Sequence, residues 1–188
     1  SPAIRGAETW AFRRAAKVIG VSAALTRFAA SLGVPEGRLA TVPNGVDGSL
    51  YHPRSRAECR AKHGIGPGAK MLLSAGYLVE GKGHHDIVRA VARLRAEGLP
   101  VELWIAGGPG REGDFEPAIR AAISSAGLEA VVRMTGAVPA LTLAEFMSAA
   151  DVLCLASYAE GWPNVVHEGM ACGVPVVAAA VGGVPEMI

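Results

Sequence analysis

The sequence of 188 residues is long enough for one domain, or for one domain with part of a second. Hydrophobic residues make up 51% and charged residues 19%, which is enough apolar surface to offset the entropy of folding and excludes a disordered chain. Eighteen basic and seventeen acidic side chains leave a net charge of +1, whereas a protein that coats nucleic acid normally carries a clear basic excess. We therefore expect no nucleic-acid partner.

Neither a membrane span nor an export signal is predicted. The longest uncharged stretch, Gly169 to Pro185, is broken by glycines and prolines and makes a poor transmembrane helix. Charged side chains interrupt the first residues, which lack the basic-then-apolar pattern of a signal peptide. Three cysteines, at positions 59, 154 and 172, are an odd number without metal-ligand spacing, so we expect a reduced, cytoplasmic chain.

Short apolar runs rich in Val, Ile and Leu recur along the whole chain. They are nearly continuous rather than alternating, which is typical of strands buried on both faces of a parallel sheet. In chain order these predicted strands are 18–21, 39–42, 71–75, 101–106, 131–135, 152–156 and 174–178.

Amphipathic helical patterns lie between the predicted strands. Residues 84–96 place Ile87, Val91 and Leu94 on one helical face, with arginines elsewhere. The same pattern occurs at 114–126, 143–149 and 165–172. Strands alternating with helices through short, glycine-containing connections predict an α/β fold with a doubly wound parallel sheet, similar to a Rossmann domain.

Two features indicate that the chain is a fragment of a larger protein. Residues 48–53 contain little periodic structure and are predicted to be a linker, and only two predicted strands precede them, too few for a domain. At the other end, Pro185 and Glu186 resemble the start of a helix, yet the chain ends two residues later.

The loop after the third predicted strand contains a lysine suited to phosphate. Residues 76–83 match a P-loop through Lys82, but Gly83 stands where a Ser or Thr must hold magnesium. A lysine beside the helix N-terminus near His84 still favours phosphate binding. The alternative is a solvated loop lysine. His84 and His85 are expected to start the helix rather than bind metal, because adjacent helical side chains point apart.

Residues 108–113 form a G-x-G-x-x-G string between a predicted strand and a predicted helix. A nicotinamide site also needs an acidic residue at the end of the next strand, and none is present there. Pro109 also removes a backbone donor from the loop. We interpret the string as a turn, with an NAD-binding oxidoreductase fragment as the alternative function.

Residues 160–168 carry two glutamates around a predicted helix start at Pro163 or Asn164. The helical rise places Glu160 and Glu168 about 10 Å apart, which excludes the roughly 5 Å carboxylate pair of a retaining glycosidase. The spacing suits an elongated ligand with phosphates over the helix end and a hydroxyl-rich ring at each carboxylate. Two solvated glutamates are the alternative, disfavoured by the apolar neighbours of Glu168.

These motifs together resemble a known enzyme family. The segment from residue 160 reads EGWPNVVHEGMACGVPVVAAAVGGVPEMI and closely resembles the signature of family 4 retaining glycosyltransferases of the GT-B fold, also called group 1 glycosyltransferases. Further matches occur in the same order at 42–47, at Lys82-Gly83 and at 149–152. The resemblance covers nearly the whole chain.

The resemblance implies a division into domains. Residues 1–47 would be the tail of the N-terminal, acceptor-binding Rossmann-like domain and 48–54 the interdomain linker. Residues 55–188 would be the C-terminal nucleotide-sugar-binding domain, truncated at its end.

The resemblance also implies roles for individual residues. Lys82 would bind the donor diphosphate, Glu168 the ribose hydroxyls, and Glu160 the transferred sugar, while Val138 would lie against the base. The implied donor site comprises Gly76, Tyr77, Lys82, Gly108, Val138, Glu160, Gly161, Trp162, Pro163, Asn164, Val165 and Glu168, with Glu160 and Lys82 as the catalytic residues. Tyr77 departs from the family, because many relatives have an arginine there.

The implied activity is transfer of a sugar, with retention, from a nucleotide diphosphate-sugar to a saccharide or lipid-linked acceptor. The acceptor would bind the missing N-terminal domain, so we expect the fragment to bind donor nucleotide without catalysis. No cofactor or metal is expected. The full-length enzyme would be cytoplasmic and peripheral at the inner membrane face. The alternatives are an NAD-binding oxidoreductase fragment, a non-catalytic nucleotide-binding module and a GT-B nucleotide-sugar epimerase.

Overall fold

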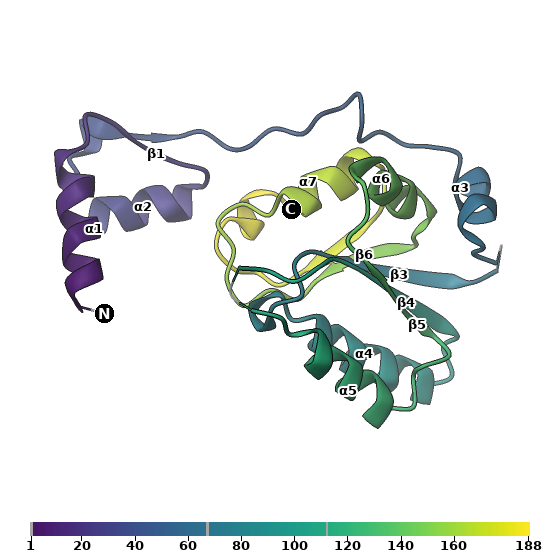
Figure 1. Ribbon diagram of the computed structural model, residues 1–188. Coiled ribbons are helices and arrows are strands. Elements are labelled where there is room, and N and C mark those ends of the chain that lie inside the picture. Colours follow the sequence, from purple (N-terminus) through teal and green to yellow (C-terminus); the bar gives the residue numbers. More distant parts are fainter. Residues whose placement is uncertain (1, 67, 112) are drawn as a thin grey trace. The chain divides into compact units, whose positions relative to one another are not determined.

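The computed structural model describes residues 2–66, 68–111 and 113–188, and most of its helices and strands are labelled in Figure 1. The chain forms two compact units. Unit 1 contains the chain up to Gly45 together with Ala159–Pro163 and Ala180–Ile188, and unit 2 contains Val46–Tyr158 and Asn164–Ala179. The domain boundaries expected from the sequence, at 47–48 and 54–55, stay predictions.

Unit 1 contains a parallel pair of strands at the two apolar runs that the sequence predicts there. The sequence patterns gave no bounds for the helices around these strands. The elements are α1 (Pro2–Arg14), β1 (Val18–Gly20), α2 (Ala23–Ser31), η1 (Glu36–Arg38), β2 (Leu39–Thr41) and η3 (Val184–Glu186).

The N-terminus of α2 is closed by a carboxylate from the far end of the sequence. The amides of Ala23 and Ala24 donate to the two carboxylate oxygens of Glu186 at 2.7 and 2.9 Å. The side chain of Ser22 accepts from Leu25, as a helix cap does. The hydrogen bonds from the Ala23 and Ala24 amides lower the pKa of Glu186, so the carboxylate is charged where the positive end of the helix dipole favours it.

Unit 2 is built on a five-stranded parallel sheet in the order β5-β4-β3-β6-β7. The strands are β3 (Lys70–Ala75), β4 (Val101–Ala106), β5 (Val132–Gly136), β6 (Val152–Leu155) and β7 (Val176–Ala178). The chain first adds strands on one side of β3 and then returns to add the others on the opposite side. This order confirms the predicted doubly wound sheet and places its topological switch point between β3 and β6.

Helices cover both faces of this sheet (Figure 1). One face is covered by α4 (His84–Ala96) and α5 (Glu116–Ser125), and the other by α3 (Arg56–His63), α6 (Ala140–Ala149) and α7 (Asn164–Ala171). Alternate strand residues enter two separate clusters: Met71 and Leu73 pack toward α6, whereas Leu103 and Ile105 pack toward α4 and α5. Since both faces are buried, the strands read as continuous apolar runs in the sequence.

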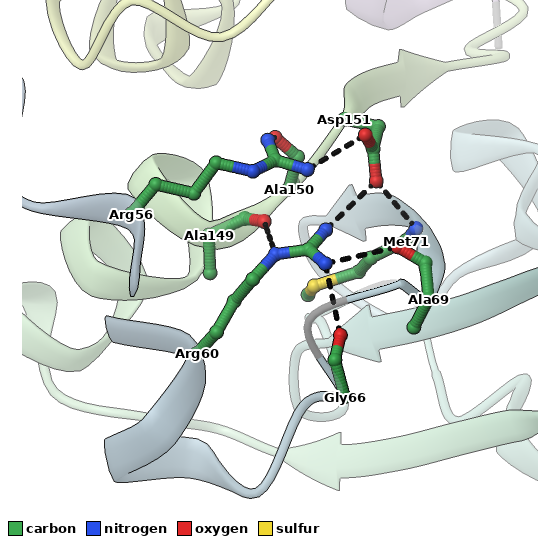
Figure 2. Close-up of polar contacts among 8 residues, drawn as sticks. All are labelled: Arg56, Arg60, Gly66, Ala69, Met71, Ala149, Ala150 and Asp151. Carbon is green, nitrogen blue, oxygen red and sulfur yellow. Dashed lines mark hydrogen bonds and ion pairs between the residues drawn. The ribbon is translucent and has the colours of Figure 1, made fainter. Parts of the chain in front are cut away.

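A buried arginine joins α3 to the sheet. The Arg60 side chain is 5% exposed, and its guanidinium reaches across to backbone carbonyls and a carboxylate that lie far apart in the sequence (Figure 2). Five donors in a rigid fork suit arginine to this position, where a lysine would satisfy fewer acceptors. Arg60 donates to the carbonyls of Ala149, Gly66 and Ala69, each at 3.0 Å, and to Asp151 at 2.9 Å.

Asp151 lies at the start of β6 and joins it to β3. Its carboxylate accepts from the Met71 amide at 2.8 Å, while its own amide donates to the Met71 carbonyl, also at 2.8 Å. Arg56 adds a second ion pair at 2.6 Å. Burial opposes ionisation, but the Met71 amide and the two guanidiniums outweigh it and lower the pKa of Asp151. The carboxylate therefore fixes β6 beside β3 at the switch point.

We predict that Arg60→Gln lowers the free energy of unfolding by about 3 kcal/mol, because it removes one partner of a buried ion pair. Arg120→Gln is the matched control, since Arg120 pairs with Glu116 on the exposed face of α5. That change should cost no more than about 0.5 kcal/mol. Urea denaturation of both variants measures the difference, and equal effects would contradict the structural role of Arg60.

Candidate functional site

The loops that follow the parallel strands are hydrogen-bonded to one another along one edge of the sheet. The Gly107 amide donates to the Gly136 carbonyl at 2.9 Å, which joins the loop after β4 to the end of β5. Leu78 donates to Gly108 at 2.8 Å and so joins the loop after β3 to the loop after β4. The predicted binding loops of unit 2 therefore form one continuous surface at the carboxyl edge, where open α/β sheets bind ligands.

Lys82 ends a short helical turn, η2 (Glu80–Lys82), in the loop between β3 and α4. Its side chain is half-buried, and its aliphatic part packs over Gly76. A Cβ added to Gly76 would lie 3.8 Å from the Cδ atom of Lys82. His84 begins α4 directly after Gly83, as the sequence predicts. The structure therefore places a lysine beside the N-terminus of a helix.

The loop that carries Lys82 also touches the loop after β6, on the other side of the switch point. The Tyr158 amide donates to the Gly81 carbonyl at 2.8 Å. Gly83 has a left-handed φ of +66°, and a Cβ added to it would overlap the carbonyl of Ala156. Only glycine meets both constraints, so Gly83 permits the close approach of the two loops.

Glu168 lies in the second turn of α7 and is half-buried, as expected from its apolar neighbours. Burial raises the pKa of Glu168, and a hydrogen bond from the Tyr51 hydroxyl only partly offsets that effect. Burial and then the Glu168 carboxylate raise the pKa of Tyr51 to about 12, so the phenol stays protonated and donates. Tyr51 could not be predicted from the sequence, because its pairing with Glu168 has no local sequence signal.

The N-terminus of α7 is at Asn164, one of the two positions that the sequence predicts. First-turn amides of any α-helix lack a carbonyl one turn earlier, so the amides of Asn164 and Val165 belong to the positive end of α7. Because α7 follows β6, this end lies at the carboxyl edge of the same sheet as Lys82. Unit 2 therefore carries the predicted lysine and the predicted helix end on segments that follow two neighbouring strands, β3 and β6, and Glu168 lies one turn further along α7.

The predicted residues Glu160, Gly161, Trp162 and Pro163 belong to unit 1. Their backbone packs against the turn that precedes η3: a Cβ added at Gly182, where φ is +54°, would overlap the Glu160 carbonyl. Pro163 is buried and the other three residues are half-buried. The expected contribution of these four residues to ligand binding stays a prediction.

The remaining predicted residues have different surroundings. Tyr77 is 65% exposed, and its carbonyl lies 3.2 Å from Nε2 of the His84 ring. Val138 is partly buried against the core cluster that contains Phe146 of α6. A Cβ on Gly108 would meet the Cβ of Ala137 at 3.3 Å, so these two loops are also in close contact.

The glycine string at 108–113 closes on itself. Gly110 and Gly113 exchange two backbone hydrogen bonds, at 3.2 and 3.3 Å, and α5 begins only at Glu116. Glu112 lies outside the described residues. A cavity of about 310 Å³ lies beside this turn, lined by Val79, Glu80, Gly81, Gly113, Asp114 and Phe115, and contains none of the predicted ligand-binding residues. A nicotinamide-binding loop leads directly into a helix, whereas this turn does not.

Among the residues that the structure describes, no three His, Cys, Asp or Glu side chains gather in a way that could hold a metal ion. All three cysteines are free thiols. None of the helices in the described part of the chain has the length and apolar character needed to cross a membrane.

Comparison with known families identifies the chain. Residues 55–188 match the family model described as glycosyl transferases group 1. The chain belongs to the group 1 glycosyltransferase family. This confirms the resemblance seen in the sequence motifs, and the parallel sheet with helices on both faces is the C-terminal half of the GT-B fold found in that family.

The group 1 glycosyltransferases most similar in sequence include a D-inositol 3-phosphate glycosyltransferase of Pseudarthrobacter chlorophenolicus. It is 35% identical over 156 residues, which span 83% of this chain and 37% of that protein. The enzyme of the same name from Arthrobacter is 36% identical over 148 residues, covering 78% of this chain and 35% of its own length. The chain thus spans little more than a third of these relatives.

Two solved structures extend the comparison. Anabaena HepE in complex with UDP and glucose has a TM-score of 0.86 and 27% identity over 98% of this chain and 50% of its own. Sucrose-phosphate synthase from Thermosynechococcus elongatus has a TM-score of 0.90 and 26% identity over 100% of this chain and 46% of its own. Both likenesses extend over unit 1 as well as unit 2.

We predict that Gly83→Ala lowers the free energy of unfolding by about 2 kcal/mol or more, because a left-handed φ alone costs an alanine about 1–2 kcal/mol. The overlap with Ala156 adds to this cost. Gly81→Ala is the matched control, since nothing lies within 4 Å of its added Cβ. It should change stability by less than about 1 kcal/mol. Equal melting temperatures for the two variants would contradict the close approach.

Glu168→Gln should stabilise the protein at neutral pH. Folding raises the pKa of this carboxyl group, because burial disfavours its charged form. The group therefore lowers the stability of the protein once the pH rises above the pKa that it has in the unfolded chain. Glutamine removes the charge and still accepts from Tyr51. Urea unfolding at pH 4 and pH 7 tests this: the variant should be the more stable at pH 7, and its advantage should shrink at pH 4. A variant less stable than wild type at pH 7 would count against burial as the dominant cause.

Proposed function

We propose that this chain forms the donor site of a retaining glycosyltransferase, which moves a sugar from a nucleotide diphosphate-sugar to a saccharide or lipid-linked acceptor. The observation that carries the proposal is the arrangement in unit 2, where Lys82 and the N-terminus of α7 follow the neighbouring strands β3 and β6 on either side of the switch point, with Glu168 one turn into α7. Anabaena HepE, whose structure holds UDP and glucose, supports a uridine nucleotide as one candidate donor.

Each group in unit 2 has a chemical role in this proposal. Lys82 binds the diphosphate, and the amides of Asn164 and Val165 bind the phosphate nearest α7. Glu168 accepts hydrogen bonds from the ribose hydroxyls, while Tyr51 occupies one of its oxygens and orients the carboxylate. Val138 lies against the base, and the turn at Gly108 borders the same ligand.

The reaction needs stabilisation of the leaving diphosphate more than acid or base chemistry on this chain. Breaking the bond from sugar to phosphate leaves negative charge on the diphosphate. A fixed ammonium and a helix N-terminus supply positive potential at that place before the reaction begins, which is electrostatic stabilisation of the leaving group. Lys82 therefore counts as a catalytic residue, and no metal ion is part of the proposal.

The sugar and the acceptor involve other parts of the protein. Glu160, with the backbone of Gly161–Asn164, holds the transferred sugar in this proposal, on the strength of the family motif alone. Acceptor binding is assigned to the N-terminal domain, so the isolated chain binds donor nucleotide without transferring sugar. We place the whole enzyme in the cytoplasm, peripheral at the inner face of the membrane, where lipid-linked acceptors are available.

A panel of UDP, GDP, ADP and NAD tests the donor site through the melting temperature. Ligand at a hundredfold excess over its dissociation constant stabilises a protein by about 2.7 kcal/mol, which is a shift of about 5–10 °C for a chain of this size. We expect one nucleoside diphosphate to give such a shift and NAD to give none. Stabilisation by NAD alone would support the oxidoreductase alternative instead.

The same panel with variants locates the site. Lys82→Ala should weaken nucleotide binding about 10- to 100-fold, the usual worth of a hydrogen bond to a charged group. Lys70→Ala is the matched control, because Lys70 is exposed at the opposite end of β3. It should bind as wild type does. Equal losses in the two lysine variants would mean non-specific attraction of the anion rather than a site.

A further inference from the structure

His84 is a buried imidazole whose contacts lead to the loop that carries Lys82. The residue is 2% exposed, and its two ring nitrogens meet different partners. Nδ1 lies 2.8 Å from the hydroxyl of Ser74, near the end of β3, and Nε2 lies 3.2 Å from the carbonyl of Tyr77 in the loop. The ring therefore bridges the end of the strand and the first turn of the loop.

The partners determine which nitrogen carries the proton. A backbone carbonyl only accepts, so Nε2–H donates to Tyr77, and Nδ1 accepts from the Ser74 hydroxyl. Burial, together with the charge of Lys82 and the neighbouring His85, lowers the pKa of His84, against the opposing effect of the Tyr77 and Gly76 carbonyls. The imidazole is therefore neutral near pH 7 and has one donor and one acceptor, as its two partners require.

A short series of hydrogen bonds runs from His84 to the backbone of Lys82. The Tyr77 carbonyl that accepts from His84 also accepts from the Val79 amide at 2.9 Å, and the Val79 carbonyl accepts from the Lys82 amide at 3.1 Å. The turn from Tyr77 to Lys82 thus begins at the carbonyl that His84 holds. On its far side, the loop is fixed by the Tyr158 amide, which donates to Gly81.

The adjacent histidine has a separate set of contacts. His85 Nε2 lies 3.0 Å from the hydroxyl of Tyr158, which donates to Asp86 at 2.8 Å. The contacts of His85 are therefore to Tyr158, on the far side of the loop, and to the ring of Phe115. The contact to the Tyr77 carbonyl belongs to His84.

We propose that His84 is a positioning residue for the donor site: its neutral ring holds the Tyr77 carbonyl and so sets the turn that presents Lys82 to the diphosphate. This proposal rests on the proposed function for its consequence in ligand binding. The holding of the loop itself does not depend on that function. His84 does not touch the ligand in this arrangement, and its effect passes through the loop backbone.

Two amide variants separate positioning from simple packing. Glutamine places its NH₂ group where Nε2–H lies and can donate to Tyr77, whereas asparagine reaches only the place of Nδ1 and keeps the contact to Ser74 alone. His84→Asn should weaken binding of the nucleoside diphosphate selected in the panel about fivefold, the usual net worth of one neutral hydrogen bond. His84→Gln should restore most of that affinity. Calorimetric titration well below the melting temperature measures both.

His63→Asn is the matched control for loss of a part-buried histidine. His63 pairs with Glu145 at 2.8 Å between α3 and α6, and neither residue belongs to the proposed donor site. The control should lower stability and leave nucleotide affinity unchanged. If the asparagine and glutamine variants of His84 both bind as wild type does, or are weakened equally, the positioning role is wrong.

Hydrogen exchange without nucleotide gives a second readout that is independent of the proposed function. His84→Asn should speed exchange of the Val79, Lys82 and Gly83 amides, and His84→Gln should bring it back toward wild type. That pattern in a chain that binds no nucleoside diphosphate would overturn the donor-site proposal and leave the loop-holding role of His84 intact. Unchanged exchange in the asparagine variant would overturn the role of His84, whatever the nucleotide results.

Discussion

The pairing of β6 with β3 is the constraint on which the rest of unit 2 depends. These strands are neighbours in the sheet but are about eighty residues apart in the sequence, so their register has no local determinant. Asp151 supplies one, because its backbone and carboxylate bond Met71 while Arg60 and Arg56 hold the carboxylate from α3. Fixing the strands at this end also fixes where the loops meet at the other end. The approach of Gly83 to Ala156 therefore depends on a contact made at the opposite edge of the sheet.

Much of this fold could be predicted from the sequence, because buried parallel strands are continuous apolar runs. The limits of β4 and α4 agree residue by residue with their predicted ranges, and the other strands differ by one or two residues at their ends. Helix α3 was not predicted, since charged side chains dominate it. A capping signal was present, however: Ser55 accepts from the amide of Glu58, and Ser-x-x-Glu is a known helix start.

In the candidate site, the residues that could be predicted are those that follow a predicted strand. Lys82, Asn164 and Glu168 could be placed because each follows a recognisable strand, and the carboxyl ends of parallel strands meet at one edge. The groups that orient them could not be placed in this way. Tyr51 reaches Glu168 from a segment without regular structure, and His84 appears in the sequence only as one of two adjacent histidines at a helix start. Such pairings arise from side-chain directions in three dimensions, which no sequence spacing encodes.

The carboxylate of Glu186 on the N-terminus of α2 has a consequence for how the polypeptide acquires its structure. The donor and acceptor of this contact are 163 residues apart, and unit 1 also includes Ala159–Pro163. Synthesis on the ribosome makes α2 long before Glu186, so the helix has only its local Ser22 cap while nearly all of unit 2 is translated. Contacts of such high sequence separation slow folding, because the loop entropy must be lost before they form. Unit 1 should therefore be the last part of this chain to become ordered.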